Sequence, residues 1–144
     1  MIPAHPLDRP VWSALTTRVA PLAIRRAQDG GSAVRLDPDV GVFVAAADDT
    51  PASRTLLDAL CREYPGAGLV EPEGEPIAAV LPDVPVLSQA SCVQMTAAGL
   101  TAGHEDDLEI LTLGEADADE MLALATLTRP GPFRRGTLRL GGFI

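Results

Sequence analysis

The stretch between Val42 and Glu71 restricts the possible folds more than any other part of the sequence. It opens with Val42-Phe43-Val44, the most β-prone triplet in the chain. A helix is predicted to follow, because Thr50 is a good N-cap residue and Pro51 stands at the first helical position. Four apolar residues then recur at helical spacing: Leu56, Leu57, Leu60 and Cys61. These signals predict a strand that leads into an amphipathic helix.

The end of this stretch supplies a second strand. Pro65-Gly66 ends the helix, and Gly68 to Glu71 is a candidate strand. A strand, a helix and a strand in this order make a β-α-β unit. We therefore assign the chain to the α/β class, with mixed strands and short helices.

The sequence before this unit predicts one helix and two strands. Asp8 can cap a short helix that begins near Arg9–Pro10. The segment Gln28 to Ser32 is expected to form a loop. The two strands are expected at Ala33 to Leu36 and Gly41 to Ala46, on either side of an Asp37-Pro38-Asp39 turn.

Proline and glycine are dense from Glu71 to Pro85, and the prolines there exclude a long helix. The polar run Gly103 to Asp107 is the best candidate for an internal boundary. We expect an N-terminal αβ lobe over residues 1–104 and a second unit over residues 105–144. Short strands are predicted at Ile77 to Leu81, Val84 to Leu87, Ser91 to Ala97 and Leu108 to Leu113.

The second unit is expected to contain two helices. Asp117, with Glu120 three residues later, has the spacing of a capping box at a helix start. Phe133 to Leu140 is expected to form a second short helix that ends at Gly141-Gly142. The apolar face of the first helix is formed by Met121, Leu122, Leu124, Ala125 and Leu127.

The charge of the chain argues against two kinds of partner. Twenty acidic and 11 basic residues give a formal net charge of −9. A nucleic-acid partner needs a basic face to neutralise phosphates, and an anionic membrane repels an acidic surface. We therefore expect neither nucleic acid nor membrane as a partner. All basic residues are arginine, so chemistry that needs a lysine, such as a Schiff base, is excluded.

The cysteines and the N-terminus favour a reduced cytoplasm. Cys61 and Cys92 are too few to make a disulfide framework, and two free thiols are expected. The segment Met1 to Arg9 lacks the basic start and apolar core of a signal peptide. No apolar run approaches the length that spans a bilayer.

Two segments of the second unit resemble the GNAT superfamily of N-acetyltransferases. Gly114 to Ala125, Gly-Glu-Ala-Asp-Ala-Asp-Glu-Met-Leu-Ala-Leu-Ala, is similar to the start of that family's first helix. Pro130 to Phe133, Pro-Gly-Pro-Phe, is similar to the loop that follows it. His5 to Trp12 and the Gln94-Met95 pair also resemble a bacterial branch with a long N-terminal extension. The resemblance implies that residues 105–144 are the first strand and helices of a GNAT domain.

In this family, acetyl-CoA binds at a central strand and at the helix after it, and the acetyl group passes directly to an amine. The resemblance implies that this cofactor-binding half lies beyond Ile144, so that the GNAT fold is incomplete here and no catalytic residue can be assigned. An N-acetyltransferase that is inactive alone is the leading hypothesis. The alternative is a non-catalytic interaction module or remnant. An incomplete sheet leaves an edge exposed, so a homodimer or a complementing chain is expected as partner in either case.

The resemblance also gives candidate substrate-binding residues. In GNAT enzymes the segment between the first two helices helps to wall the acceptor pocket. Phe133 is a candidate for packing on the acceptor, and Arg134 or Arg135 for holding an anionic group. The simpler interpretation is that Phe133 fills the domain core and that both arginines face solvent.

Two weaker motifs are interpreted as structural. Gln28 to Ala33 matches the family's phosphate signature, Arg/Gln-x-x-Gly-x-Gly/Ala, but a strand and not a helix is expected after it. We therefore expect no cofactor-binding residue there. His5 and His104 have no partners at metal-ligand spacing, so no metal site is expected.

Overall fold

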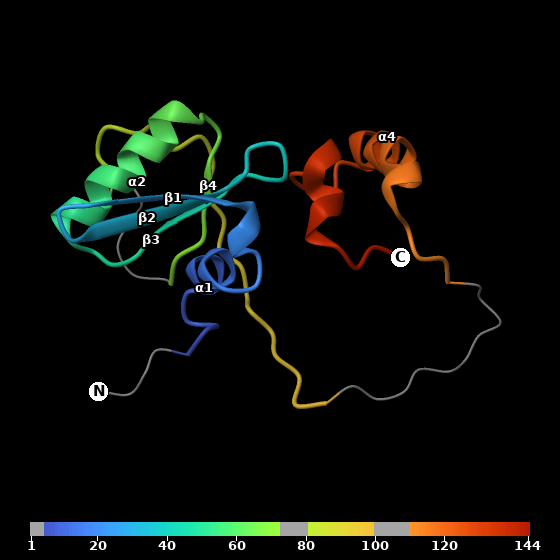
Figure 1. Cartoon of the computed structure of the whole chain (residues 1–144), viewed down its shortest axis with the longest axis horizontal. Coiled ribbons are helices and arrows are strands. Elements are labelled where there is room, and N and C mark those ends of the chain that lie inside the picture. The colour runs from blue at the N-terminus through green and yellow to red at the C-terminus, as the bar shows by residue number, and fades with distance from the viewer. Residues whose placement is uncertain (1–4, 73–80, 100–109) are drawn as a thin grey trace.

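The computed structural model describes residues 5–72, 81–99 and 110–144, and confirms the α/β class (Figure 1). The N-terminal part holds four strands and two α-helices, and the C-terminal part holds one α-helix between two 3₁₀ turns. In chain order the elements are α1 (Pro10–Thr16), η1 (Ala20–Leu22), β1 (Ala23–Gln28), β2 (Gly31–Leu36), β3 (Phe43–Ala46), α2 (Pro51–Glu63), β4 (Gly68–Leu69), η2 (Glu115–Asp117), α4 (Ala118–Thr128) and η3 (Arg135–Leu140).

The predicted β-α-β unit is confirmed, with a shorter second strand. β3 and β4 pair in parallel, and α2 makes the crossover between them. Thr50 caps α2 as expected, because its Oγ1 accepts a hydrogen bond of 3.3 Å from the backbone N–H of Ser53. A parallel pair cannot be joined by a tight turn, so the helix is needed to return the chain to the same end of the sheet.

The first half of the sheet was partly missed by the sequence pattern. The expected loop over residues 28–32 is wrong, because Asp29-Gly30 is a two-residue turn that joins β1 to β2 as an antiparallel hairpin. Both turn residues have positive φ, 52° at Asp29 and 80° at Gly30, as the favoured hairpin turn requires. The sheet order is β1-β2-β3-β4, with antiparallel pairing except between β3 and β4.

The sheet is covered by a helix on each face, α2 on one and α1 on the other (Figure 1). Alternate residues of β2 and β3 divide between the two apolar clusters, as the two-residue period of a strand requires. The cluster under α2 contains Ala33, Val44, Ala46, Leu57, Leu60, Cys61 and Leu81. The cluster under α1 contains Leu15, Val34, Leu36, Val40 and Ala45.

Helix α1 begins where the sequence predicts, but its cap differs. Arg9 occupies the N-cap position, and no side chain caps the helix there. The expected cap, Asp8, instead accepts a hydrogen bond of 2.7 Å from the backbone N–H of His5. The cap prediction is therefore wrong, because the Asp8 carboxylate closes a turn before the helix.

Several predicted strands are not formed. Val84 to Leu87, Ser91 to Ala97 and residues 110–113 contain no strand. Their alternation fits a strand, but a strand also needs a neighbour whose backbone it can pair with. Residues 77–80 and 103–107, on which an edge strand and a boundary were predicted, lie outside the described residues. Among the described residues, no helix is long and apolar enough to cross a membrane.

The C-terminal part buries little of its apolar surface. The helix predicted from Asp117 is confirmed as α4, and the second one is the 3₁₀ turn η3. Asp117 Oδ2 accepts a hydrogen bond of 2.7 Å from the backbone N–H of Gly114, so it caps η2 rather than α4. Ala118 is the buried residue of α4, whereas Leu124 is 60% exposed and Leu127 is 81% exposed.

Gly31 is required by close packing against α2. A Cβ at this position would lie 2.5 Å from the backbone carbonyl carbon of Ala52 and from the backbone nitrogen of Ser53. We expect Gly31→Ala to lower the free energy of unfolding by about 1–3 kcal/mol, measured by urea denaturation, because backbone must move to admit the methyl group. Gly114→Ala is the control, since a Cβ there meets nothing within 4 Å. Equal effects of the two changes would contradict the packing argument.

Candidate functional site

The loop between α4 and η3 carries the residues that the sequence singles out. Phe133 is half-buried, and its ring meets the ring of Phe143 edge-on, with centroids 6.0 Å apart and planes at 80°. Such a pair is a favourable aromatic contact. It holds the loop against the last residues of the chain. The predicted role of Phe133 toward an acceptor stays a prediction.

The two arginines of this loop differ in their partners. Arg134 is exposed, and its backbone N–H donates a hydrogen bond of 2.8 Å to Thr137 Oγ1. Within the described residues, no carboxylate forms an ion pair with the Arg134 guanidinium. Arg135 instead forms an ion pair with Asp119 at the start of α4. Arg134 is therefore the arginine whose side chain is available to an anion.

η3 docks on the turn between β2 and β3. Thr137 is buried and donates a hydrogen bond of 2.7 Å from its Oγ1 to the backbone carbonyl of Val40. The backbone N–H of Gly136 donates to the carbonyl of Asp39 at 3.1 Å. Arg139 pairs with Asp37 at 3.0 Å. These contacts place the loop that carries Arg134 beside the N-terminal sheet.

The hydrogen bonds at this turn also change the pKa of Asp37. The backbone N–H of Asp39 donates to Asp37 Oδ1 at 2.9 Å, and Arg139 donates to Oδ2. The Asp39 hydrogen bond is the larger cause, and together they lower the pKa of Asp37 below its ordinary value. Asp37 therefore stays ionised while it holds η3.

A second candidate site lies at the carboxyl ends of β3 and β4. In open α/β sheets this edge is where ligands generally bind. A crevice of about 350 Å³ opens there, beside the first turn of α2. Its walls are formed by Arg9, Ala46, Asp48, Asp49, Arg54, Leu57, Leu69, Glu71 and Pro72.

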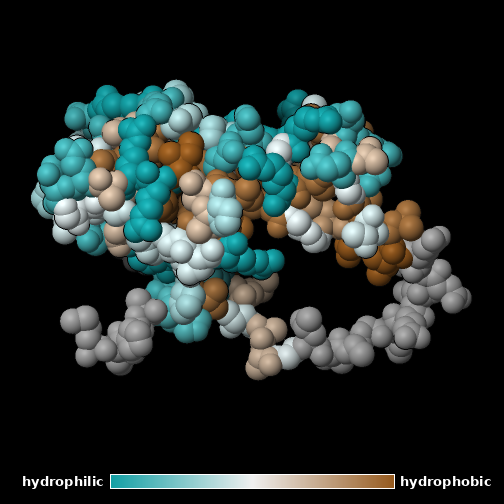
Figure 2. Space-filling view, viewed as in Figure 1, coloured by the Kyte–Doolittle hydropathy of each residue, from teal (hydrophilic) through white to brown (hydrophobic). Residues whose placement is uncertain are grey.

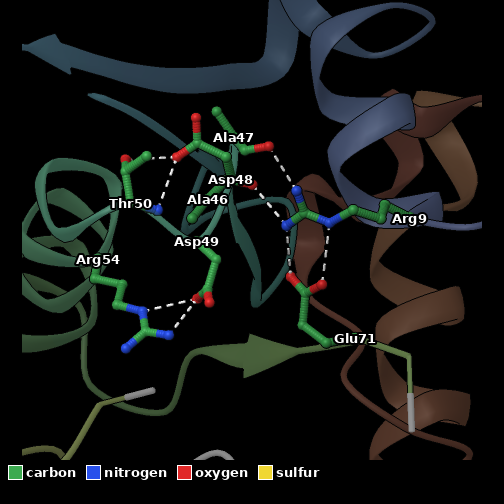
Figure 3. Close-up of polar contacts among 8 residues, drawn as sticks. All are labelled: Arg9, Ala46, Ala47, Asp48, Asp49, Thr50, Arg54 and Glu71. Carbon is green, nitrogen blue, oxygen red and sulfur yellow. Dashed lines mark hydrogen bonds and ion pairs between the residues drawn. The ribbon is translucent and has the colours of Figure 1, made fainter. Parts of the chain in front are cut away.

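Arg9 ties the two strand ends of this crevice together (Figure 3). Its Nη1 and Nη2 donate to the carbonyls of Ala47 and Ala46, at 2.6 and 2.7 Å. Its Nε and Nη2 also donate to the carboxylate of Glu71, at 3.1 and 3.0 Å. A planar guanidinium can make these four bonds at once, whereas an ammonium cannot.

The acidic residues of the crevice are mostly engaged within the protein (Figure 3). Asp48 Oδ1 accepts from the hydroxyl and the backbone N–H of Thr50, and such hydrogen bonds lower its pKa. Asp49 pairs with Arg54. Sequence reasoning missed this group, although the predicted β-α-β unit already placed residues 47–50 after its first strand and Glu71 at the end of its second.

The third unusual feature is a buried charge. Arg35 lies on β2, is 1% exposed, and donates a hydrogen bond of 3.3 Å from Nη1 to the carbonyl of Val42. Its guanidinium carbon lies 4.8 Å from the centre of the Tyr64 ring, and among the described residues its Nε has no hydrogen-bond partner. Burial, and after it the charge of Arg134, lowers the pKa of Arg35. Nothing in the sequence marked this residue.

The motif Gln28 to Ala33 does not form the strand, loop and helix of a pyrophosphate site. Gln28 to Ala33 forms the hairpin turn and the start of β2, as the interpretation of that motif expected. Gly31 abuts the first turn of α2, and a backbone N–H of that turn is already bound by Thr50. In the described part of the chain, no three histidine, cysteine or acidic side chains gather as a metal site would require.

The chain is similar in both sequence and fold to a protein whose structure is solved. This is a protein from Novosphingobium aromaticivorans DSM 12444 that is named as an inferred acetyltransferase from the GNAT family. The two share 38% sequence identity with a TM-score of 0.71, over 94% of this chain and 56% of the other. No family model and no curated protein matches the chain. The resemblance to the GNAT family that residues 114–125 and 130–133 carry is therefore confirmed.

Replacing Arg9 tests how the crevice is held. We expect Arg9→Lys to lower the free energy of unfolding by about 1–3 kcal/mol. A lysine keeps the charge, but its ammonium group cannot make all the hydrogen bonds that Arg9 donates to Glu71 and to the two carbonyls. Thermal and urea denaturation provide the measurement. Arg54→Lys is the matched control, because its partner Asp49 is 75% exposed and a surface pair contributes little. Equal losses in both variants would contradict the role given to Arg9.

Replacing Arg35 tests whether its buried charge costs stability. We expect Arg35→Met to raise the free energy of unfolding by about 1–4 kcal/mol, because a hydrophobic side chain of similar length removes an unpaired buried charge. Arg25→Met on exposed β1 is the control and should change stability by less than about 0.5 kcal/mol. A clear loss of stability in Arg35→Met would show that the contacts with Tyr64 and Val42 outweigh the cost of burial.

Proposed function

We propose that this chain, which matches a GNAT-family protein in sequence and fold over 94% of its length, is the N-terminal part of an acetyl-CoA-dependent N-acetyltransferase. The observation that carries this proposal is the 38% identity, because it extends over both the N-terminal lobe and the C-terminal helices. The chain spans 56% of the length of that relative. The proposed reaction moves an acetyl group from the thioester to an amine, in the cytoplasm.

The acetyl-CoA site is proposed to lie in sequence that this chain does not contain. The hairpin at residues 28–33 does not make a phosphate cradle, and the N-terminus of α2 is occupied by its own cap. The catalytic groups would come from the same additional sequence. On this proposal the described residues position the acceptor side of the enzyme and do not carry out the transfer.

Phe133 and Arg134 are proposed to contact the acceptor. Their loop is fixed at both ends, by the Phe133–Phe143 ring contact and by the docking of Thr137 on Val40. A loop held in this way can present the exposed Arg134 guanidinium in a constant place. The exposed arginine is suited to an anionic group of the acceptor.

The exposed apolar side chains support a complementing chain or a second copy as partner. In the view of Figure 2, hydrophobic surface lies at the lower right of the C-terminal part, while the surface around α4 is mostly hydrophilic on this face. Among the described residues, the large apolar side chains that are more than half exposed all follow residue 86, which indicates that the N-terminal sheet has closed its own core. They are Leu87, Val93, Met95, Ile110, Leu111, Leu124, Leu127 and Ile144.

This surface also supports a second candidate function. A chain that exposes Leu124 and Leu127 on one helix can act as a non-catalytic module that binds another protein. The two functions differ in one respect, which is whether acetyl-CoA is bound once the chain is extended to the full length of its relative.

Calorimetric titration with acetyl-CoA tests the enzyme proposal. We expect no saturable binding to residues 1–144, and micromolar binding to a chain extended through the genomic sequence that follows Ile144. Acetyl transfer to each of a panel of amines would then be measured through the free CoA thiol that the reaction releases, and this would identify the acceptor. Saturable binding to residues 1–144 alone would contradict the proposed place of the cofactor site. The absence of binding to the extended chain would favour the interaction module.

Charge placed on α4 tests the proposed partner surface. If residues 1–144 self-associate through this face, Leu127→Glu should lower the dimer fraction at least about tenfold at fixed concentration, because a carboxylate would be buried against apolar surface. Sedimentation velocity gives the measurement. Ala123→Glu adds the same charge to an exposed position of the same helix and serves as control. An equal response of both variants would indicate a general charge effect and not a docking face.

A further inference from the structure

A long uncharged segment lies exposed after the N-terminal sheet. Residues 84–99 contain no charged side chain, although 22% of the residues of the whole chain are charged. Leu87 is 84% exposed, and Val93 and Met95 are each 88% exposed. Apolar side chains that gather in this way on a surface mark a site of interaction.

The later part of this segment has the period of a strand. We call residues 92–98 the arm. Val93 and Met95 alternate in it with Gln94 and Thr96, so the two apolar side chains share one face of the extended chain. Uncharged segments of this length, with β-prone residues and no proline, pair readily with other strands. Within the described part of the chain, no strand pairs with the arm. In Figure 1 its trace, drawn in gold, leads away from the sheet.

One edge of the sheet also lacks a neighbour. β4 is the last strand in the sheet order, and β3 pairs with it on one side. Among the described residues, no strand lies on its other side. An open edge presents backbone N–H and C=O groups with which a further strand can pair.

A groove of about 310 Å³ lies beside this edge. Its lining comes from residues 66–69, from residues 84–88, and from Cys61 and Leu81. None of these residues is charged. Cys61 and Leu81 also belong to the apolar cluster under α2, so the groove leads onto the core of the lobe. An apolar groove beside an open sheet edge fits an uncharged extended segment, because the edge binds its backbone and the groove its alternate side chains.

We propose that the arm of one molecule occupies this groove in a second copy of the chain, with Val93 and Met95 inside it, and that the exchange is reciprocal. The arm begins four residues after residue 88, where the lining of its own groove ends. To enter its own groove the chain would have to turn back within these residues, whereas the arm extends away from the lobe (Figure 1). Exchange of an identical element between two copies is a low-cost route to a closed dimer.

This inference deepens the partner proposal above, and it rests on the part of that proposal that names a second copy. It adds the segment and the groove that make the contact. It uses no residue of α4 and no step of acetyl transfer. A failure of arm exchange therefore leaves the acetyl-CoA titration and the α4 face to their own measurements.

Sedimentation velocity of residues 1–144 tests the exchange. We expect a reversible dimer at a concentration on the order of 100 μM. Val93→Glu should lower the dimer fraction at least about tenfold, because a carboxylate would enter the apolar groove. Gln94→Glu adds the same charge to the opposite face of the arm and should leave most of the dimer intact. A monomer at this concentration, or an equal response of the two variants, overturns the proposal. Dissociation by Leu127→Glu and not by Val93→Glu would place the contact on α4 and would overturn it as well.

A cross-link identifies both the groove and the molecule that fills it. The chain has two cysteines, Cys61 in the groove lining and the exposed Cys92. In a Cys92→Ser background, Met95→Cys should form a disulfide with Cys61 of a second molecule under mild oxidation, whereas Gln94→Cys should form little of it. Non-reducing electrophoresis and peptide mass spectrometry give the readout. A Cys61 disulfide within a single molecule would show that the arm folds back into its own groove, and its absence from a dimeric sample would exclude the groove. Either result overturns the proposal.

Discussion

The crossover helix α2 holds β3 and β4 in parallel, and most of the molecule is arranged around that constraint. Leu57 and Leu60 of α2 are buried on the sheet together with Val44 of β3. The same helix sets the position of β2, because Gly31 lies so close to its first turn that a side chain is not accommodated. Burial of these apolar side chains supplies the main driving force of the N-terminal lobe.

The C-terminal part is attached to this lobe mainly by polar contacts, and Leu140 of η3 also packs against the apolar cluster under α1. Thr137 and Gly136 bond the carbonyls of Val40 and Asp39, and Arg139 pairs with Asp37. Individual hydrogen bonds contribute about 1 kcal/mol each, so such a junction fixes orientation more than it adds stability. The loop around Arg134 is therefore held in place by hydrogen bonds, although the leucines of α4 stay exposed to solvent.

Arg9 and Arg35 are both partly or fully buried arginines, but their contacts differ. Arg9 uses all three of its nitrogens in four hydrogen bonds to two carbonyls and Glu71, so its charge stabilises the edge of the sheet. Within the part of the chain that the structure describes, Arg35 has one hydrogen bond of 3.3 Å and one aromatic contact, and its Nε has no partner. The two residues therefore differ in how completely the fold satisfies their charge.

The sequence alone determined the β-α-β unit, the cap and start of α2, the helix α4 and the family resemblance, because each of these depends on local spacing or on a short motif. The tertiary structure decided the rest. The β1–β2 hairpin was not predicted, because Arg25 and Arg26 interrupt the apolar pattern that would mark β1 as a strand. The strands expected near residues 91–97 and 110–113 did not form because pairing needs a neighbour that local pattern cannot supply. The crevice at Arg9 and the docking of Thr137 on Val40 join residues 62 and 97 positions apart, and only the folded chain brings such pairs together.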